Sequence, residues 1–226
     1  DLHKEYRRQR QMCIRDRIYQ YIIKDKQQGG DLYTHLRCKR KRKKRYGSYN
    51  RRGQIKNRIS IDQRPDAVNE RSRMGDWEAD TIIGKGHKQA IVSLTERKSG
   101  YALFMKVDHK SKVDVEKACN HLLYSIRNKV HTITSDNGKE FANHESVAKA
   151  LQINVFFADP YSAWQRGLNK KTNGLIRQYV PKGYDVRVLT DEQVERIMNR
   201  LNNRPRKSLG FLTPNEVFYK RKKLTG

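Results

Sequence analysis

The order of the hydrophobic patterns after Met74 restricts the fold of this chain more than any other feature of its sequence. Three stretches rich in β-branched and aromatic residues come first, at residues 77–84, 89–96 and 101–107. Short segments with turn residues, Gly84-Lys85-Gly86 and Lys98-Ser99-Gly100, join them. Strand patterns connected by such tight turns predict an antiparallel meander.

Helical and strand patterns alternate after the meander. Apolar residues recur at helical spacing after Ser111, and Asp114 completes a predicted helix cap. Two strand patterns and two helical ones follow, at residues 130–135, 145–151, 154–157 and 166–179. Thr190 and Thr213 are placed to cap two more helices. This order predicts an α/β fold with a mixed sheet, three antiparallel strands and then two parallel ones, flanked by helices, as in the RNase H-like fold.

The charge of the chain points to a polyanionic partner. Fifty Lys and Arg residues against 24 Asp and Glu give a net charge of +26, which is far more than solubility requires. Residues 1–60 alone hold 20 basic and 5 acidic residues. Nucleic acid is therefore the first candidate partner, and an anionic membrane surface is the second.

Residues 1–73 are expected to form a basic, partly disordered DNA-binding arm, with a short helix near residues 18–25 and a polar linker at residues 53–73. We interpret the arm as the remnant of a helix-turn-helix region. Its candidate phosphate contacts are Arg40, Lys41, Arg42, Lys43, Lys44, Arg45, Arg51 and Arg52. A run of like charges repels itself until it meets phosphate. The plainer alternative is a solvated linker. Residues 74–226 form the second predicted domain.

Other classes of protein are disfavoured. No apolar run approaches the roughly 20 residues that a membrane span needs. The cysteines, Cys13, Cys38 and Cys119, are widely spaced, which argues against a thiolate zinc site and fits a reducing cytoplasm. We therefore expect no membrane partner.

Two aspartates are candidates for a metal-binding crevice. Asp136 ends the strand pattern at residues 130–135 and is followed by the turn signal Asn137-Gly138. Asp80 lies on the first strand of the meander. Parallel neighbouring strands would bring both carboxylates together, where they repel unless a cation lies between them, and Mg²⁺ favours such ligands. The plainer alternatives are an Asp136 that only starts a turn and an Asp80 on the solvent face of an edge strand.

Several motifs carry a family resemblance. They are Trp77-Glu78-Ala79-Asp80, the segments 134–141, 160–167, 173–179 and 201–206, and Leu212-Thr213-Pro214. Through these motifs the chain, from about Ile18 to its C-terminus, resembles the IS-thirty family of bacterial insertion-sequence transposases. Such enzymes resemble retroviral integrases in using an Asp, Asp, Glu triad on an RNase H-like core.

The resemblance implies roles for particular residues. Asp80 would be the first acid and Asp136 the second, together holding Mg²⁺ or Mn²⁺ in a two-ion site. Lys170 stands at the position of the expected Glu. The implied partners are double-stranded DNA, both the transposon terminal repeats and the target, and further copies of the chain. The implied reaction is nicking followed by attack of a 3′-hydroxyl on target DNA, and the implied location is the bacterial cytoplasm, at the nucleoid.

Lys170 changes what this chain is expected to do. A ligand of charge −1 becomes a side chain of charge +1, so we hypothesise that the chain still binds DNA and cleaves it poorly. Asp159 is the better candidate for a substitute acid, whereas Glu140 is expected to start the next helix.

Three further residues are candidate DNA contacts beside the site: Arg166, Asn173 and Arg177. A solvated helix face is the plainer alternative for Asn173 and Arg177. Trp164, Gln165 and Arg166 precede the helix and are candidates for a DNA-facing loop, although we expect Trp164 rather to pack in the core. Two other functions stay open, a non-catalytic DNA-binding regulator derived from a transposase and a generic basic RNA-binding protein. In each case affinity should fall steeply with salt.

Overall fold

The computed structural model describes residue 14 and residues 17–36, 55–87, 89–160 and 162–219. The chain divides into two compact units, residues 1–51 with 205–212 and residues 52–204 with 213–226. No helix within the described ranges is long and apolar enough to cross a membrane.

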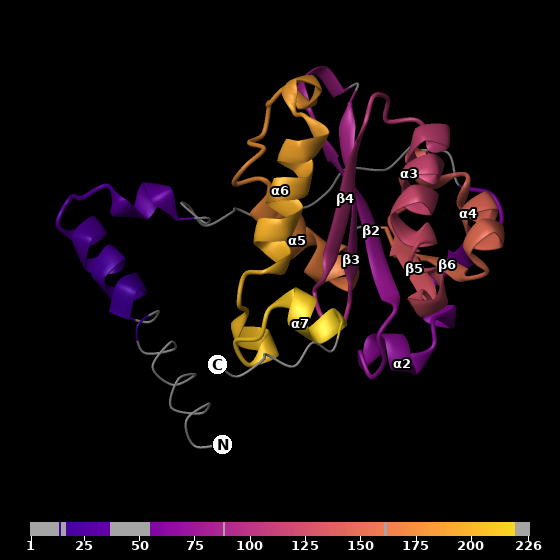
Figure 1. Ribbon diagram of the computed structural model, residues 1–226, viewed down its shortest axis with the longest axis horizontal. Coiled ribbons are helices and arrows are strands. Elements are labelled where there is room, and N and C mark those ends of the chain that lie inside the picture. Colours follow the sequence, from indigo (N-terminus) through magenta and orange to yellow (C-terminus); the bar gives the residue numbers. More distant parts are fainter. Residues whose placement is uncertain (1–13, 15–16, 37–54, 88, 161, 220–226) are drawn as a thin grey trace. The chain divides into compact units, whose positions relative to one another are not determined.

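The second unit is built on a mixed sheet of six strands (Figure 1). The strands are β1 (Ile59–Ser60), β2 (Asp76–Ile83), β3 (Ala90–Glu96), β4 (Ala102–Val107), β5 (Thr132–Ser135) and β6 (Asn154–Phe157), in the order β1-β6-β5-β2-β3-β4. Strands β2, β3 and β4 form the antiparallel meander, and β5 pairs in parallel with both β2 and β6. The predicted mixed sheet is therefore confirmed, and β2 is a central strand rather than an edge strand.

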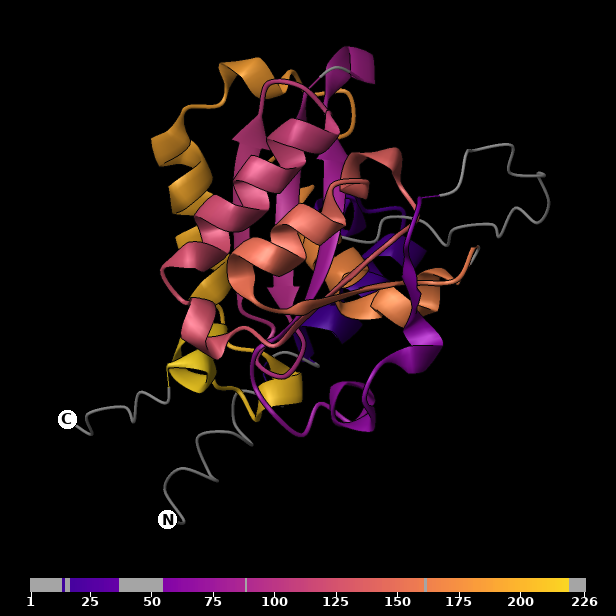
Figure 2. The same ribbon diagram turned by 90° about the vertical axis from the view of Figure 1, so that its right-hand side faces the viewer.

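Helices cover both faces of this sheet (Figures 1 and 2). Helices α3 (Lys112–Tyr124) and α4 (His144–Leu151) lie on one face, and α5 (Gly167–Ile176) and α6 (Asp191–Asn202) lie on the other. Helix α7 (Pro214–Phe218) follows α6. Short 3-10 helices occupy the connections: η2 (Ile61–Gln63), η3 (Lys85–His87), η4 (Arg127–Lys129), η5 (Lys139–Phe141), η6 (Ala163–Arg166) and η7 (Val186–Val188).

Each face of the sheet has its own hydrophobic core. Side chains alternate along a strand, so Trp77 and Ala79 of β2 pack into the core beneath α3 and α4. Ile82 packs into the second core beneath α5 and α6. Glu78 and Asp80 lie an even number of positions from Ile82 along β2, so their side chains point to the same face of the sheet as Ile82. This is the face that α5 covers.

The helix starts follow the sequence signals. Ser111 accepts a hydrogen bond from the backbone N–H of Asp114 at the start of α3. Thr190 with Gln193 and Thr213 with Glu216 form complete capping boxes at α6 and α7. These caps satisfy backbone donors that a helix leaves unpaired, which is why the three helices begin where the sequence predicts.

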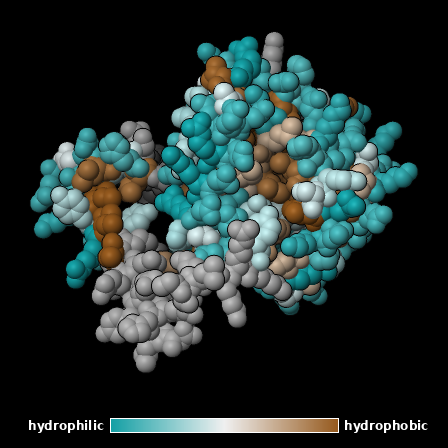
Figure 3. Space-filling model, in the orientation of Figure 1, coloured by the Kyte–Doolittle hydropathy of each residue, from teal (hydrophilic) through white to brown (hydrophobic). Residues whose placement is uncertain are grey.

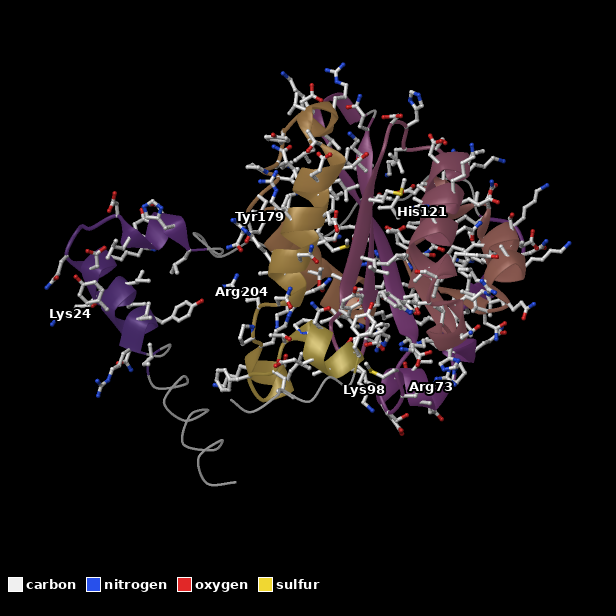
Figure 4. The ribbon with its side chains drawn as sticks, viewed as in Figure 1. Lys24, Arg73, Lys98, His121, Tyr179 and Arg204 are labelled. Carbon is white, nitrogen blue, oxygen red and sulfur yellow. The ribbon has the colours of Figure 1, made fainter. Side chains whose placement is uncertain are left out.

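The linker predicted at residues 53–73 is wrong for its described part. Strand β1 pairs in parallel with β6, α2 (Asp66–Asn69) follows η2, and Val68 is completely buried. The segment is tied to the meander near its end, where Arg73 pairs with Asp76 at 3.0 Å and Lys98 donates to the Ser72 carbonyl at 2.6 Å. Figure 4 shows Arg73 and Lys98 at this end of the sheet.

The first unit contains a short helix, as predicted. Residues 17–27 are helical and precede η1 (Leu32–His35), where Asp25 accepts a hydrogen bond from the backbone N–H of Leu32 at 3.1 Å. Ile18 and Ile23 are more than half exposed, and apolar side chains show on the surface of this helix in Figure 3. Among its described residues, this unit also contains the 3-10 helix η8 (Lys207–Leu209).

Candidate active site

The two aspartates singled out in the sequence converge from neighbouring strands. Asp80 lies on β2, and Asp136 directly follows β5, the parallel neighbour of β2. The Asp80 side chain is 25% exposed and that of Asp136 is 39% exposed. The carboxylates thus lie at one end of the β5 strand, at the surface of the face that α5 covers.

Arg166 bridges these two carboxylates. Its Nη2 donates to Asp136 Oδ2 at 3.2 Å, and its Nη1 lies 3.6 Å from Asp80 Oδ1. Nη1 also donates to the carbonyl of Ala79 at 3.1 Å. Arg166 was predicted to contact DNA, but in this structure its guanidinium is largely buried and holds the acid pair together. A positive charge beside two close carboxylates offsets their mutual repulsion.

Burial and neighbouring charges set the pKa of Asp80. Burial raises its pKa above the ordinary value, the positive charge of Arg166 opposes this rise, and the nearby charge of Asp136 adds to it. The net direction is upward, so Asp80 accepts a proton more readily than a carboxyl in water.

Helix α5 is fixed to the sheet by buried polar contacts. Asn169 donates its backbone N–H to Glu78 Oε2 at 2.8 Å and its side-chain amide to the Glu78 carbonyl at 2.6 Å. The same amide donates to the carbonyl of Ser93 on β3 at 3.1 Å. Glu78 also forms a buried ion pair with Arg97. These contacts set the height and rotation of α5 over the acid pair.

The predicted contacts Asn173 and Arg177 both bind the protein itself. Asn173 Nδ2 donates to Asp80 Oδ2 at 3.0 Å, and Ser93 Oγ donates to Asn173 Oδ1 at 2.7 Å. Arg177 Nη2 donates to the carbonyl of Ile83 at 2.8 Å, and burial lowers the pKa of Arg177. Neither residue therefore lies on a merely solvated helix face, and Asn173 is part of the surroundings of Asp80.

Lys170 lies on the same side of α5 as these residues. It is one helical turn beyond Arg166 and one turn before Asn173, both of which contact the acids. Its side chain is exposed, and no hydrogen bond or ion pair joins it to another described residue. The position of the expected third acid therefore carries an exposed positive charge on the side of α5 that also holds Asn173.

The acids considered as substitutes have other partners. Asp159 Oδ2 accepts from the side chain of Gln165 at 2.8 Å. Glu140 was expected to start the next helix, but it lies within the short η5, α4 begins only at His144, and its side chain turns back toward β2. Its Oε1 pairs with Lys110 Nζ at 2.7 Å and accepts from Thr81 Oγ1 at 2.9 Å. A Cβ on Gly138 would lie 2.8 Å from Asp136 Oδ1 and 2.5 Å from Glu140 Oε2, so a larger residue would displace the ends of these two carboxylates.

The donor set does not fit a two-ion site. Within the described residues, no group of three or more His, Cys, Asp or Glu side chains is placed to hold a metal. Asp80 and Asp136 are of the type that a single Mg²⁺ accepts, but the Arg166 guanidinium occupies the space between them.

Two sequence interpretations near the site have different outcomes. The prediction that Trp164 packs in the core is wrong, because this residue is 75% exposed. The candidate phosphate contacts of the arm lie outside the described residues: Arg40, Lys41, Arg42, Lys43, Lys44, Arg45, Arg51 and Arg52. They stay predictions.

Comparison with known proteins places this geometry in context. Residues 70–163 match the model of the family described as "Integrase core domain". The chain is 48% identical over 208 residues to the transposase for insertion sequence element IS4351 of Bacteroides fragilis, covering 92% of this chain and 64% of that protein. It is 37% identical over 164 residues to transposase InsI for insertion sequence element IS30C of Escherichia coli, covering 72% and 43%. The chain thus spans less than two thirds of these relatives.

Solved structures resemble the fold. The chain superposes on a chain of the simian T-cell lymphotropic virus intasome, solved with PP2A regulatory subunit B56 gamma, with a TM-score of 0.54 and 17% identity over 68% of this chain and 57% of that one. The HTLV-2 integrase catalytic core domain, solved in complex with magnesium in a trimeric form, gives a TM-score of 0.50 and 18% identity over 65% and 97%. These matches establish the RNase H-like architecture.

Proposed function

Because this chain carries an integrase core domain and is related to the IS30-family transposases, we propose that it is the core of an insertion-sequence transposase that binds DNA at transposon ends. The observation that carries the proposal is the convergence of Asp80 and Asp136 from two parallel strands. The net charge of +26 provides the long-range attraction to DNA. Duplex DNA and further copies of the chain are the proposed partners.

The proposed reaction in intact relatives is metal-dependent nicking of a DNA strand and attack of the freed 3′-hydroxyl on target DNA. A pair of bound divalent cations would supply an activated water or hydroxyl and stabilise the leaving oxygen. In this chain the residues do not fit that pair of ions. Asp80 and Asp136 instead hold Arg166, and Lys170 repels a cation from the third position.

We therefore propose that this chain binds DNA but cleaves it poorly. The positive charge of Lys170 repels a metal ion but attracts a phosphate group of bound DNA. A non-catalytic regulator derived from a transposase is the second candidate function, because Arg166 neutralises the acid pair without any metal. The two candidates differ in whether Asp80 and Asp136 matter to any activity of the chain.

The first prediction tests the role of Lys170. Nicking of supercoiled plasmid DNA should be measured with Mg²⁺ and with Mn²⁺ for the unaltered chain and for Lys170→Glu. The variant supplies a third carboxylate, so we expect its nicking rate to exceed that of the unaltered chain by at least tenfold, since lost metal ligands cost orders of magnitude in rate. Adding Asp136→Ala to Lys170→Glu should abolish the gain.

A neighbouring lysine supplies the matched control. Lys171 is also exposed, and it is rotated by about 100° around the helix, so Lys171→Glu makes the same change of charge on a different side of α5. It should leave nicking at the level of the unaltered chain. Robust nicking by the unaltered chain that Asp136→Ala abolishes would contradict the proposal that the site is impaired.

A further inference from the structure

Trp164 is exposed in a way that its surroundings do not explain. It lies in η6, between β6 and α5, and 75% of its surface is open to water. The other tryptophan, Trp77, is completely buried. Leaving a large aromatic ring in water forgoes a substantial hydrophobic stabilisation.

The two residues that follow Trp164 are held by hydrogen bonds from their side chains. Gln165 accepts from the backbone N–H of Asp159 and donates to the Asp159 carboxylate, both at 2.8 Å. Arg166 binds Asp136 and the Ala79 carbonyl. Two consecutive residues after Trp164 are thus anchored, so the exposed ring is presented from a fixed segment.

The position of the ring limits what it can bind. Trp164 is two residues from Arg166, a span of at most about 7 Å along the chain, and Arg166 contacts both carboxylates of the site. Lys170 is exposed one turn beyond Arg166. A flat aromatic face beside cationic side chains is the combination that binds single-stranded nucleic acid, with stacking for the base and positive charge for the phosphate.

We propose that Trp164 stacks on an unpaired nucleobase at the end of the DNA strand that enters the crevice of Asp80 and Asp136. This inference rests on the proposed function and adds a base-binding residue to it. Paired bases are held between or against their neighbours in the duplex, so the base that is free to turn and lie against the ring is an unpaired one. The chain therefore prefers frayed or overhanging DNA ends to blunt ends.

The chain is suited to a direct optical test. It has two tryptophans in all, and Trp77 is buried in the core, so any quenching of indole fluorescence by DNA reports on Trp164. The probes are a blunt 20-base-pair duplex and the same duplex with three unpaired nucleotides at one 3′ end. We expect the overhanging duplex to quench the fluorescence of the unaltered chain and the blunt duplex to leave it nearly unchanged. In Trp164→Ala the remaining fluorescence should respond to neither.

Affinities measured by fluorescence anisotropy of labelled DNA complete the test. Stacking on one base corresponds to about a 5- to 150-fold effect, so Trp164→Ala should weaken binding of the overhanging duplex by that factor and change binding of the blunt duplex less than twofold. Tyr124→Ala is the matched control, since Tyr124 is 59% exposed at the end of α3. It should change neither affinity. The melting temperature of Trp164→Ala should equal that of the unaltered chain.

The possible failures are distinguishable. If the unaltered chain binds neither duplex, the proposed DNA-binding function is overturned and the stacking role falls with it. If it binds both duplexes equally, and Trp164→Ala alters neither affinity, then DNA binding stands and the stacking role is overturned. Quenching by the overhang that persists in Trp164→Ala would also overturn it.

Discussion

At the scale of single residues, Arg166 decides the state of the acid pair. Its guanidinium lies between Asp80 and Asp136 and limits the rise in the pKa of Asp80 that burial causes. A carboxyl with a raised folded-state pKa holds its proton more readily in the folded chain than in the unfolded one. The contribution of Asp80 to stability is therefore greatest below the ordinary pKa and falls as the pH rises through the folded-state value.

The second prediction concerns Arg166→Met, which removes the charge and keeps much of the side chain. It leaves two carboxylates facing each other, so the free energy of unfolding at pH 7 should fall by about 2 kcal/mol. The loss stays below the roughly 3–5 kcal/mol for breaking a fully buried pair, because Asp136 is partly in water. Mg²⁺ should then raise the melting temperature of the variant more than that of the unaltered chain, since a cation can enter between the acids.

The control for this variant is an ion pair at the surface. Arg187 pairs with Asp185 at 2.7 Å and is mostly exposed, so Arg187→Met should change the free energy of unfolding only slightly. Both variants can be compared by urea unfolding and by thermal melting with and without Mg²⁺. A loss for Arg166→Met no larger than that for Arg187→Met would rule out the bridging role.

The sequence identified some site residues and missed others for a physical reason. Asp80 and Asp136 could be predicted because strand patterns and a turn signal place them at the same edge of the sheet. The contact of Arg166 with these aspartates could not be predicted. A basic residue beside a predicted helix is usually solvated, and the sequence pattern does not show in which direction its side chain points. The exposure of Trp164 was missed likewise, since large apolar residues are usually buried.

At the scale of secondary-structure elements, Glu78 fixes α5 over the acid pair. It is completely buried, pairs with Arg97 and accepts the backbone N–H of Asn169 in the first turn of α5. A negative charge at a helix N-terminus is favourable. One side chain of the central strand thus orients the helix that carries Lys170 and Asn173.

The third prediction is that Glu78→Gln destabilises the second unit strongly. Glutamine can still accept from Asn169, but it leaves the buried guanidinium of Arg97 without a counter-charge. We expect a loss of about 3–5 kcal/mol in the free energy of unfolding, measured by urea denaturation. Adding Arg97→Met should recover part of this loss, because the unpaired charge is then removed as well.

Glu70→Gln provides a comparison at the surface. Glu70 is exposed beside α2, and its replacement should change the free energy of unfolding by no more than about 0.5 kcal/mol. Equal effects of Glu78→Gln and Glu70→Gln would show that Glu78 is not needed to hold α5.

Element boundaries followed the sequence where local signals are strong. The meander, β6 and the capped helices α3, α6 and α7 were predicted, because alternating strand patterns and cap residues are local signals. Strand β1 was missed because it has two residues and depends on pairing with β6, which is distant in sequence. Arg64 near it is buried and donates to Thr134 Oγ1 at 3.1 Å, although charged residues normally indicate a surface segment.

At the scale of the whole molecule, charge is spread unevenly along the chain. Residues 1–60 hold 20 of the 50 Lys and Arg residues and 5 of the 24 Asp and Glu residues. The later part is basic too, but its acids are used within the fold, as Asp80, Glu78 and Glu140 show. We therefore expect the N-terminal basic run to make many of the phosphate contacts and the acid pair to make none.

The fourth prediction follows from counterion release. Each phosphate that a basic side chain neutralises contributes about 0.9 to the slope of the logarithm of affinity against the logarithm of salt concentration. Replacing four residues of the basic run by glutamine, namely Arg42, Lys43, Lys44 and Arg45, should therefore reduce that slope by up to about four. The slope can be measured by anisotropy titrations of a labelled duplex between 50 and 300 mM NaCl, a range over which the Debye length falls to less than half.

A second basic run offers a control with the same change of charge. Lys220, Arg221, Lys222 and Lys223 follow α7, and their replacement by glutamine also removes four positive charges. If the N-terminal run binds phosphate directly, the C-terminal variant should keep most of the slope while losing some affinity through the weaker overall field. Equal reductions of the slope would mean that net charge, rather than a localised arm, governs DNA binding, and the assignment of residues 40–45 as contacts would then be wrong.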